Sequence, residues 1–193
     1  MKTVIIDYGA GNIQSISCAL SRLGFTGILS NDPEEIRTAD KVIFPGVGHA
    51  ATAMEKLKAS HLDQLIPQLT QPVLGICLGM QLLCNVSEEG NTTGLGIFDT
   101  DVVQFPVNIK SPQVGWNQIH HLESELFRGI SPADYMYFVH GYYAPVFNQT
   151  IARTDSGMHY SAAIQKDNFF GVQFHPEKSG QKGELLLHNF LKL

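Results

Sequence analysis

The sequence predicts an α/β fold, in which a largely parallel sheet carries helices on both faces. In the first half of the chain, short β-branched runs alternate with segments whose apolar residues have helical spacing. The apolar run 73–76 then changes at Cys77 into a helix-forming segment, as at the carboxyl end of a buried parallel strand. With 193 residues, of which 44% are hydrophobic, we expect one domain that covers residues 1–193.

Composition and charge narrow the class of protein. A net charge of −5 disfavours binding to nucleic acid or to an anionic membrane surface. No apolar stretch is long enough to cross a bilayer, and Asp7 ends the first apolar run in the manner of a strand rather than a signal peptide. Cys18, Cys77 and Cys84 form no close pair, which is typical of a reducing compartment. We therefore expect a cytoplasmic protein.

The N-terminal half is predicted to contain four strands separated by helices. Strands are expected at residues 3–6, 25–29, 41–44 and 73–76, and helices at 13–23, after Asp32, and at 50–65. Asp32 is placed as an N-cap, Pro33 as the first helical residue, and Glu35 to close a capping box. A nucleotide-binding loop is rejected at residues 7–12, because the third glycine of the G-x-G-x-x-G pattern would fall at Gln14.

The C-terminal half has a different pattern. Its short β-like runs are separated by proline, glycine and asparagine, which predicts antiparallel additions to the sheet. These runs are residues 95–105, 116–120, 135–140, 151–153 and 162–165, and one more strand is expected at 169–174. An amphipathic helix at 184–193 is predicted to close the chain.

Cys77 is the first candidate catalytic residue. Gly75 and Gly79 each lie two residues from it, in the G-x-nucleophile-x-G pattern of a sharp strand-to-helix turn, with a thiol in place of a serine hydroxyl. Glycines are needed there because larger side chains would collide across so tight a turn. The positive end of the following helix also favours a thiolate. A single apolar cysteine is more often an inert core residue, but the glycine pattern favours a nucleophile.

A thiol nucleophile needs a base, and His175 is the strongest candidate among the eight histidines. It follows an apolar strand and precedes Pro176. Glu177 lies two residues on, where an extended chain would place both side chains on one side. The carboxylate would then hold the imidazole in one tautomer, as the third member of a triad. Alone, His-Pro-Glu would be more typical of a strand end with a solvated acid.

Two further features bear on the site. Residues 45–48, Pro-Gly-Val-Gly, end a predicted strand, and the two glycines free backbone amides to receive an oxyanion; a simple strand-to-helix turn is an equal interpretation. His49 and His140 lie near these segments but lack a carboxylate neighbour in the sequence. No cysteine or histidine spacing typical of a zinc site occurs, so we expect no metal and no cofactor.

Three motifs, in this order, resemble those of class I glutamine amidotransferases. They are Pro45-Gly-Val-Gly48, Gly75-Ile-Cys-Leu-Gly-Met-Gln81 and Gly171-Val-Gln-Phe-His-Pro-Glu177. Within this family, Val114-Gly-Trp-Asn117 and Tyr137-Phe-Val-His140 resemble the glutaminase subunits of imidazole glycerol phosphate synthases in histidine biosynthesis. The resemblance covers nearly the whole chain and implies a flavodoxin-like, three-layer fold with a mixed sheet.

The resemblance also implies a chemistry. Cys77 would attack the side-chain amide of glutamine, His175 would transfer protons, and Glu177 would orient His175. Backbone amides of Leu78 and of Gly46 or Val47 would bind the oxyanion. The residues implied to bind the substrate glutamine are Gln81, Glu89, Gly141 and Tyr142. Ammonia would pass to a (β/α)8-barrel synthase subunit in a heterodimer, for the formation of imidazole glycerol phosphate.

Two positions depart from the pattern of these subunits. Gly141 stands where a hydroxyl residue usually follows Tyr-Phe-Val-His, so a contact to the substrate carboxylate is lost or moves to the backbone. Pro112-Gln-Val-Gly-Trp-Asn117 replaces the usual Pro-His-Met-Gly-Trp-Asn, in a stretch expected at the subunit interface. Partner affinity and signalling between the subunits are the properties that these departures bring into question.

Other functions stay open on the sequence. A glutaminase of vitamin B6 synthesis is disfavoured by Val47, since Pro-Gly-Gly would be expected there. The departures at Gly141 and Gln113 leave open a paralogue that feeds a synthase of surface polysaccharide assembly. A cysteine peptidase on the same scaffold would hydrolyse peptides without a partner. A non-catalytic regulatory subunit would bind its partner and show no thiol reactivity at Cys77.

Overall fold

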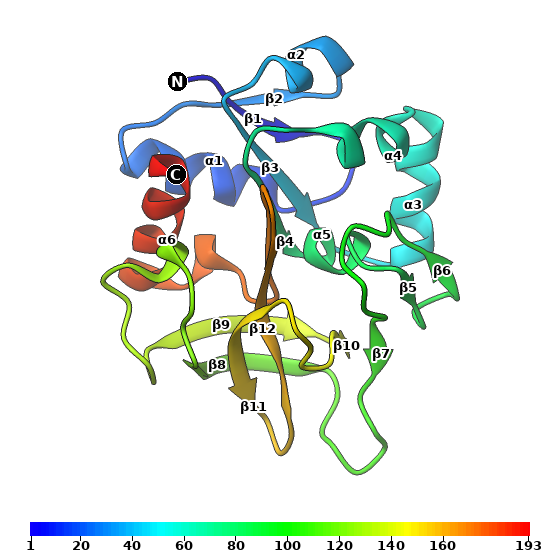
Figure 1. Ribbon diagram of the computed structural model, residues 1–193, viewed down its shortest axis with the longest axis vertical. Coiled ribbons are helices and arrows are strands. Elements are labelled where there is room, and N and C mark those ends of the chain that lie inside the picture. The colour runs from blue at the N-terminus through cyan, green and yellow to red at the C-terminus, as the bar shows by residue number, and fades with distance from the viewer.

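A mixed sheet of nine strands forms the centre of the structure, a computed structural model that describes residues 1–193 (Figure 1). Its strand order is β2-β1-β3-β4-β13-β12-β11-β8-β9. The parallel part contains β1 (Thr3–Ile6), β2 (Gly27–Ser30), β3 (Lys41–Gly46), β4 (Val73–Cys77) and β13 (Phe169–Val172). The antiparallel part contains β12 (His159–Lys166), β11 (Thr150–Asp155), β8 (Gln113–His120) and β9 (Tyr135–His140). The prediction of a parallel sheet with antiparallel additions is confirmed.

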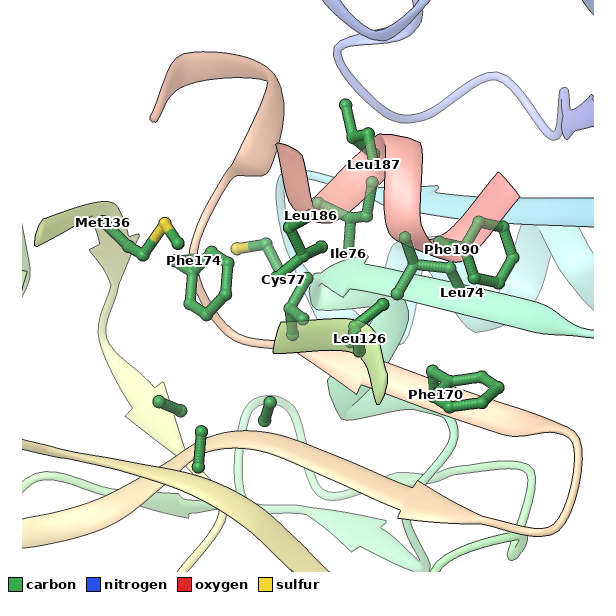
Figure 2. Close-up of a cluster of buried hydrophobic side chains, with 14 of the residues drawn as sticks. Leu74, Ile76, Cys77, Leu126, Met136, Phe170, Phe174, Leu186, Leu187 and Phe190 are labelled. Atoms are coloured by element: carbon green, nitrogen blue, oxygen red, sulfur yellow. The ribbon is translucent and has the colours of Figure 1, made fainter. Parts of the chain in front are cut away.

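Helices cover both faces of this sheet and make three layers. On one face, α1 (Ile13–Arg22) and α6 (Gly180–Lys192) share a core cluster with Ile5 and Ile43. The helices on the other face are α2 (Pro33–Arg37), α3 (Ala50–Ala59), α4 (Leu62–Leu65) and α5 (Leu78–Leu82), and they pack with Val4 and Val42. Successive residues of β1 and β3 therefore enter opposite cores, as the pleat of a strand requires. Figure 2 shows the first cluster, which includes Cys77.

Short strands and turns complete the chain. Two pairs of short antiparallel strands lie outside the main sheet: β5 (Val86–Ser87) with β6 (Thr92–Thr93), and β7 (Val103–Gln104) with β10 (Tyr142–Tyr143). Single 3-10 turns occupy Ile66–Gln68, Glu125–Phe127 and Pro176–Lys178. No helix has both the length and the apolar character needed to cross a membrane.

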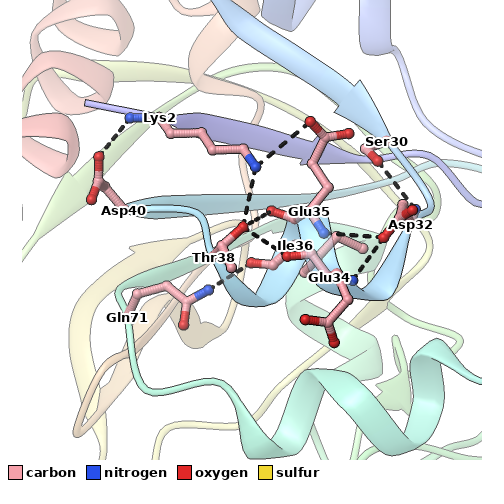
Figure 3. A network of polar contacts seen from close by, with 9 residues as sticks. All are labelled: Lys2, Ser30, Asp32, Glu34, Glu35, Ile36, Thr38, Asp40 and Gln71. Carbon is pink, nitrogen blue, oxygen red and sulfur yellow. Dashed lines mark hydrogen bonds and ion pairs between the residues drawn. The ribbon is translucent and has the colours of Figure 1, made fainter.

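The start of α2 differs from the prediction in one contact. Asp32 caps the helix as expected, because its Oδ1 accepts two backbone N–H groups of the first turn at 2.8 and 3.1 Å. Glu35 does not close a capping box, since its carboxylate lies 3.6 Å from Lys2 Nζ (Figure 3). The Asp32 N–H donates instead to Ser30 Oγ at 3.1 Å. The Lys2 ammonium group, just before β1, pairs with Glu35, and the Ser30 hydroxyl binds the Asp32 N–H, so the expected reciprocal bond does not form.

Two helix boundaries were also predicted wrongly. The helix expected at 50–65 is divided at His61, whose φ of 58° separates α3 from α4. The C-terminal helix begins at Gly180 rather than at the expected residue 184. Its first turn follows the 3-10 turn at Pro176–Lys178 almost without interruption, so the apolar periodicity alone does not mark the start.

The strand expected at 95–105 is wrong except for β7. Residues 95–98 lie at the C-terminal end of α5, where the Leu95 N–H donates to Leu82 O at 2.8 Å and the Ile97 N–H donates to Leu83 O at 2.9 Å. Carbonyls in the last turn of a helix have no partner within the helix. This segment therefore satisfies the end of α5 instead of extending the sheet.

Candidate active site

Cys77 occupies the sharp turn between β4 and α5. Its φ of 54° and ψ of −110° place it in a backbone region that residues other than glycine rarely adopt. A Cβ atom on Gly79 would lie 2.1 Å from the Phe44 carbonyl oxygen, and one on Gly75 would lie 2.8 Å from the Met80 nitrogen. Both glycines are therefore required for the close approach of α5 to β3 and β4, and the predicted strand-to-helix turn is present.

His175 and Glu177 form a buried pair. His175 Nδ1 lies 2.8 Å from Glu177 Oε1, and the two side chains are 3% and 1% exposed. The extended spacing predicted for them is wrong, since the 3-10 turn at Pro176–Lys178 brings the carboxylate back to the ring. Burial lowers the pKa of His175, but hydrogen bonds and negative charge from Cys77 and Glu177 outweigh burial and raise it overall. Because Nδ1 is held by the carboxylate, Nε2 is the nitrogen left to exchange a proton.

A cavity of about 300 Å³ lies against Cys77, at the carboxyl ends of the parallel strands. The predicted site residues that line it are Val47, Cys77, Leu78, Gln81, Glu89, Gly141, Tyr142 and His175. Gly46 and Glu177 do not line it. Gly46 pairs with Cys77 across β3 and β4, and a Cβ atom on it would lie 2.4 Å from the Gly79 nitrogen. The structure thus gathers residues from five separate segments around one thiol, in a space that suits a molecule of amino-acid size.

Residues 4–193 match the family described as glutamine amidotransferase class-I. The chain belongs to this family. It is 54% identical over 196 residues to the imidazole glycerol phosphate synthase subunit HisH of Bacteroides fragilis strain YCH46, with 100% of both chains covered. The subunit of the same name from Escherichia coli K12 is 47% identical over 196 residues, again with 100% of both chains covered.

The structure agrees with this family. A crystal structure of a glutamine amidotransferase superposes on it with a TM-score of 0.77 at 16% identity, covering 98% of this chain and 97% of the other. At that identity the likeness shows the fold alone. The expected three-layer amidotransferase fold is therefore confirmed.

In this class I amidotransferase, the side-chain amides of Gln81 and Gln173 connect the cavity wall to the Cys77 thiol. Gln81 Nε2 donates to Tyr142 O and to Gln173 Oε1, both at 2.9 Å. Gln173 Nε2 lies 3.7 Å from Cys77 Sγ, and Sγ lies 3.6 Å from Val139 O. Both amide hydrogens of Gln81 are used within the protein. Its Oε1 is therefore the atom left to accept a hydrogen bond from a ligand.

Glu89 is the carboxylate of the cavity wall. Its Oε2 accepts the Ala50 N–H at 2.7 Å, at the first turn of α3, and its own N–H donates to Ser87 Oγ at 3.2 Å. These bonds fix the side chain and leave Oε1 for a cationic group. Neither at this site nor in the rest of the chain are three or more His, Cys, Asp or Glu side chains arranged to hold a metal ion.

Among the residues of the site that were not assigned on the sequence, three have polar side chains: His140, Gln173 and Lys178. His140 and Lys178 line the cavity, and Gln173 contacts the thiol. Gln173 and Lys178 flank the His175 motif closely enough that proximity in the chain could have suggested them. His140 was set aside because it has no carboxylate neighbour, whereas its partners are a carbonyl and a phenol.

His140 is a buried, neutral imidazole. Its Nδ1 lies 2.7 Å from Tyr142 O and its Nε2 lies 3.2 Å from the Tyr160 hydroxyl, so a single tautomer satisfies both contacts. Burial lowers the pKa of His140 to about 4, and the nearby His175 adds to this lowering. Tyr142 O thus receives hydrogen bonds from both His140 and Gln81, which fixes the backbone next to Gly141.

His140→Gln should make the protein less sensitive to acid. In the unfolded chain the imidazole titrates near its ordinary value of about 6.5, so between that pH and the folded-state pKa the unfolded state binds more protons. Stability conferred by neutral His140 is therefore present at neutral pH and lost as the pH falls. Between pH 7 and pH 4.5, urea unfolding should show the wild type losing roughly 2 kcal/mol more than the variant.

The control for this measurement is His159→Gln, which removes an exposed imidazole on β12. That variant should keep the acid sensitivity of the wild type. Equal loss of stability in the wild type and in His140→Gln would show that His140 is not held neutral in the folded protein.

Proposed function

We propose that this chain is the glutaminase subunit of an imidazole glycerol phosphate synthase, and that it supplies ammonia for histidine biosynthesis. The observation that carries the proposal is that Cys77 and His175 line one cavity, with Glu177 bonded to His175. This arrangement occurs in a chain about 50% identical, over its full length, to subunits of that name. The whole of residues 1–193 serves as one amidotransferase domain. The three cysteines are all free, which is typical of proteins in a reducing compartment and supports a cytoplasmic location.

The reaction proceeds through a thioester in this proposal. His175 Nε2 takes the thiol proton of Cys77 as Sγ attacks the side-chain amide carbon of glutamine, and a tetrahedral intermediate forms. The carbon–nitrogen bond then breaks as His175 gives its Nε2 proton to the departing ammonia. Water attacks the glutamyl thioester while His175 accepts its proton, and glutamate leaves with the thiol restored. Glu177 keeps the imidazole in the required tautomer throughout, at the 2.8 Å contact to Nδ1.

Backbone amides bind the oxyanion in this scheme. We assign this role to Leu78, which follows the nucleophile at the start of α5, and to Gly46 or Val47 at the end of β3. Gly46 stands in register with Cys77, and Val47 and Leu78 line the cavity. Donors placed at the developing negative charge stabilise the tetrahedral intermediate without the reorganisation that water would need.

The remaining cavity residues suit the two ends of glutamine. Gln81 Oε1 would accept a hydrogen bond from the substrate amide, and the unoccupied oxygen of Glu89 would pair with the α-ammonium group. Gly141 has no side chain to offer, so the α-carboxylate would be bound by backbone N–H groups of Gly141 and Tyr142. The hydrogen bonds that fix Tyr142 O support this role, because they hold that part of the backbone in one position.

The outer face of β8 and β9 suits a protein partner. Val114, Trp116, Tyr135 and Val139 are exposed there, and the Trp116 side chain stacks edge-on against Tyr137 with 5.8 Å between the ring centroids. Exposed apolar patches with aromatic residues are typical of protein interfaces. We propose that a (β/α)8-barrel synthase subunit docks on this face and forms a heterodimer. Val139 connects the face to the site, since its carbonyl contacts Cys77 Sγ.

A glutaminase assay tests the proposed function. The full chain, mixed with the purified synthase subunit, should release glutamate and ammonia from glutamine and should leave peptides intact. Peptide hydrolysis by the chain alone would favour a peptidase, and the absence of any glutamine hydrolysis with the partner present would refute the proposal.

A further inference from the structure

The glycine-containing turn after β1 lies directly behind the segment at the end of β3. The Tyr8 hydroxyl donates to Pro45 O at 2.8 Å, and the Tyr8 ring packs on Phe44 with 5.6 Å between the centroids. Gly11 has a φ of +116°, and a Cβ atom on it would lie 2.9 Å from Pro45 Cβ. Residues 8 and 11 therefore hold Pro45 from one side by a hydrogen bond and by close packing.

The Tyr8 hydrogen bond takes the place of a missing ladder contact. The contact is one to the Pro45 carbonyl, which needs an N–H or O–H donor on the β1 side. β1 ends at Ile6, before it reaches the level of Pro45, and its register with β3 runs only to Ile43. The phenol of Tyr8 is thus the group that fixes the end of β3 on the β1 side.

Planarity of the peptide bond carries this restraint to the next residue. The carbonyl of Pro45 and the N–H of Gly46 belong to one trans peptide and point in opposite directions. β3 lies between β1 and β4 in the sheet (Figure 1). Since Pro45 O is directed to Tyr8 on the β1 side, the Gly46 N–H is directed to the β4 side, where Gly46 stands in register with Cys77.

Tyr8 remains a hydrogen-bond donor in this environment. Its side chain is buried, and burial raises its pKa well above the usual range, with a further increase from the negative charge of Cys77. A protonated phenol on a backbone carbonyl is therefore kept at any pH at which the protein works.

We propose that Tyr8 is a positioning residue for glutamine hydrolysis: by holding the Pro45–Gly46 peptide in one orientation, it sets the backbone amides that receive the oxyanion. This inference rests on the proposed glutaminase function. It gives a role to the turn at residues 8–11, whose glycine spacing does not fit a nucleotide-binding loop.

Tyr8→Phe tests the proposal, because it keeps the ring and removes only the hydroxyl. In the full chain mixed with the synthase subunit, kcat for glutamate release should fall about tenfold while the KM for glutamine stays within about twofold. Alkylation of Cys77 by iodoacetamide forms no oxyanion, so its rate should be unchanged in the variant. Tyr143→Phe is the matched control, since it removes a phenol whose ring packs on Phe105 instead, and it should keep the wild-type kcat.

The possible outcomes distinguish a failure of the positioning role from a failure of the proposed function. An unchanged kcat in Tyr8→Phe overturns the positioning role. A parallel loss of kcat and of the alkylation rate also overturns it, because it would show a general disturbance of the site. A KM increase at constant kcat also overturns it. Lack of glutamine hydrolysis by the wild type would instead refute the proposed function. Thermal unfolding of each variant confirms that the protein compared is folded.

Discussion

Cys77→Ser is expected to reduce glutamine hydrolysis by at least about a thousandfold in the presence of the synthase subunit. Serine matches cysteine closely in size and can occupy the same strained turn, where φ is 54°. Its hydroxyl, however, is a far weaker acid than a thiol and yields little nucleophile at neutral pH. The measurement is glutamate release at saturating glutamine, and binding of the variant to the partner should be unchanged.

Cys18→Ser provides the matched control, since Cys18 is exposed on α1, away from the cavity. It should retain wild-type turnover. Activity that survives in Cys77→Ser, or that disappears in Cys18→Ser, would contradict the assignment of Cys77 as the nucleophile.

His175→Gln is expected to have the second largest effect, also a loss of about a thousandfold or more. Glutamine can still accept and donate hydrogen bonds, but it cannot carry a proton from Cys77 to the leaving ammonia. kcat should fall much more than the KM for glutamine rises. Wild-type kcat in this variant would exclude His175 as the proton carrier. The control is His159→Gln, at an exposed site on β12, which should leave kcat unaltered.

The stability of His175→Gln should depend on pH in a definite direction. The folded-state pKa of His175 is raised by Cys77 and Glu177 against the effect of burial, so protonation of His175 favours the folded state. This stability is fully present below the unfolded-state pKa of about 6.5 and is lost as the pH rises through the higher folded-state value. Urea unfolding should therefore show the variant weakened most at acidic and neutral pH, with a smaller difference in alkaline solution.

The parallel half of the fold could be predicted from the sequence because its signals are local and agree with one another. The apolar run of β4, the glycines on either side of Cys77 and the change of periodicity at that residue all require the same turn. Strand alternation then places the end of β3 and Cys77 at one edge of the sheet. The cavity residues therefore followed largely from motif order and topology.

The contacts that were missed depend on how the chain turns back on itself in space. Residues 95–98 have the composition of a strand, yet they satisfy the carbonyls of α5, a competition that depends on where the helix ends in space. His140 finds its partners in Tyr142 O and the Tyr160 hydroxyl, the latter twenty residues away on β12. Glu177 reaches His175 through a 3-10 turn rather than an extended chain, so that prediction named the pair correctly for a wrong geometric reason.

The dependence of glutamine hydrolysis on the partner is the central property of the proposed enzyme. Val47 is 39% exposed and Gly48 has open space around its Cα, so the amides that follow Gly46 have room to reorient. Docking on β8 and β9 would act on the site through Val139, whose carbonyl contacts the thiol at 3.6 Å. A site completed only on docking would prevent ammonia from being released without an acceptor.

The dependence on the partner is tested most directly by measuring glutamate release in three mixtures. These are the chain alone, the chain with the synthase subunit, and the chain with both the subunit and its nucleotide ligand. We expect slow hydrolysis by the chain alone and an increase of at least about a hundredfold in the full complex, which is the effect typical of completing an oxyanion site. Equal rates with and without the barrel subunit would contradict it.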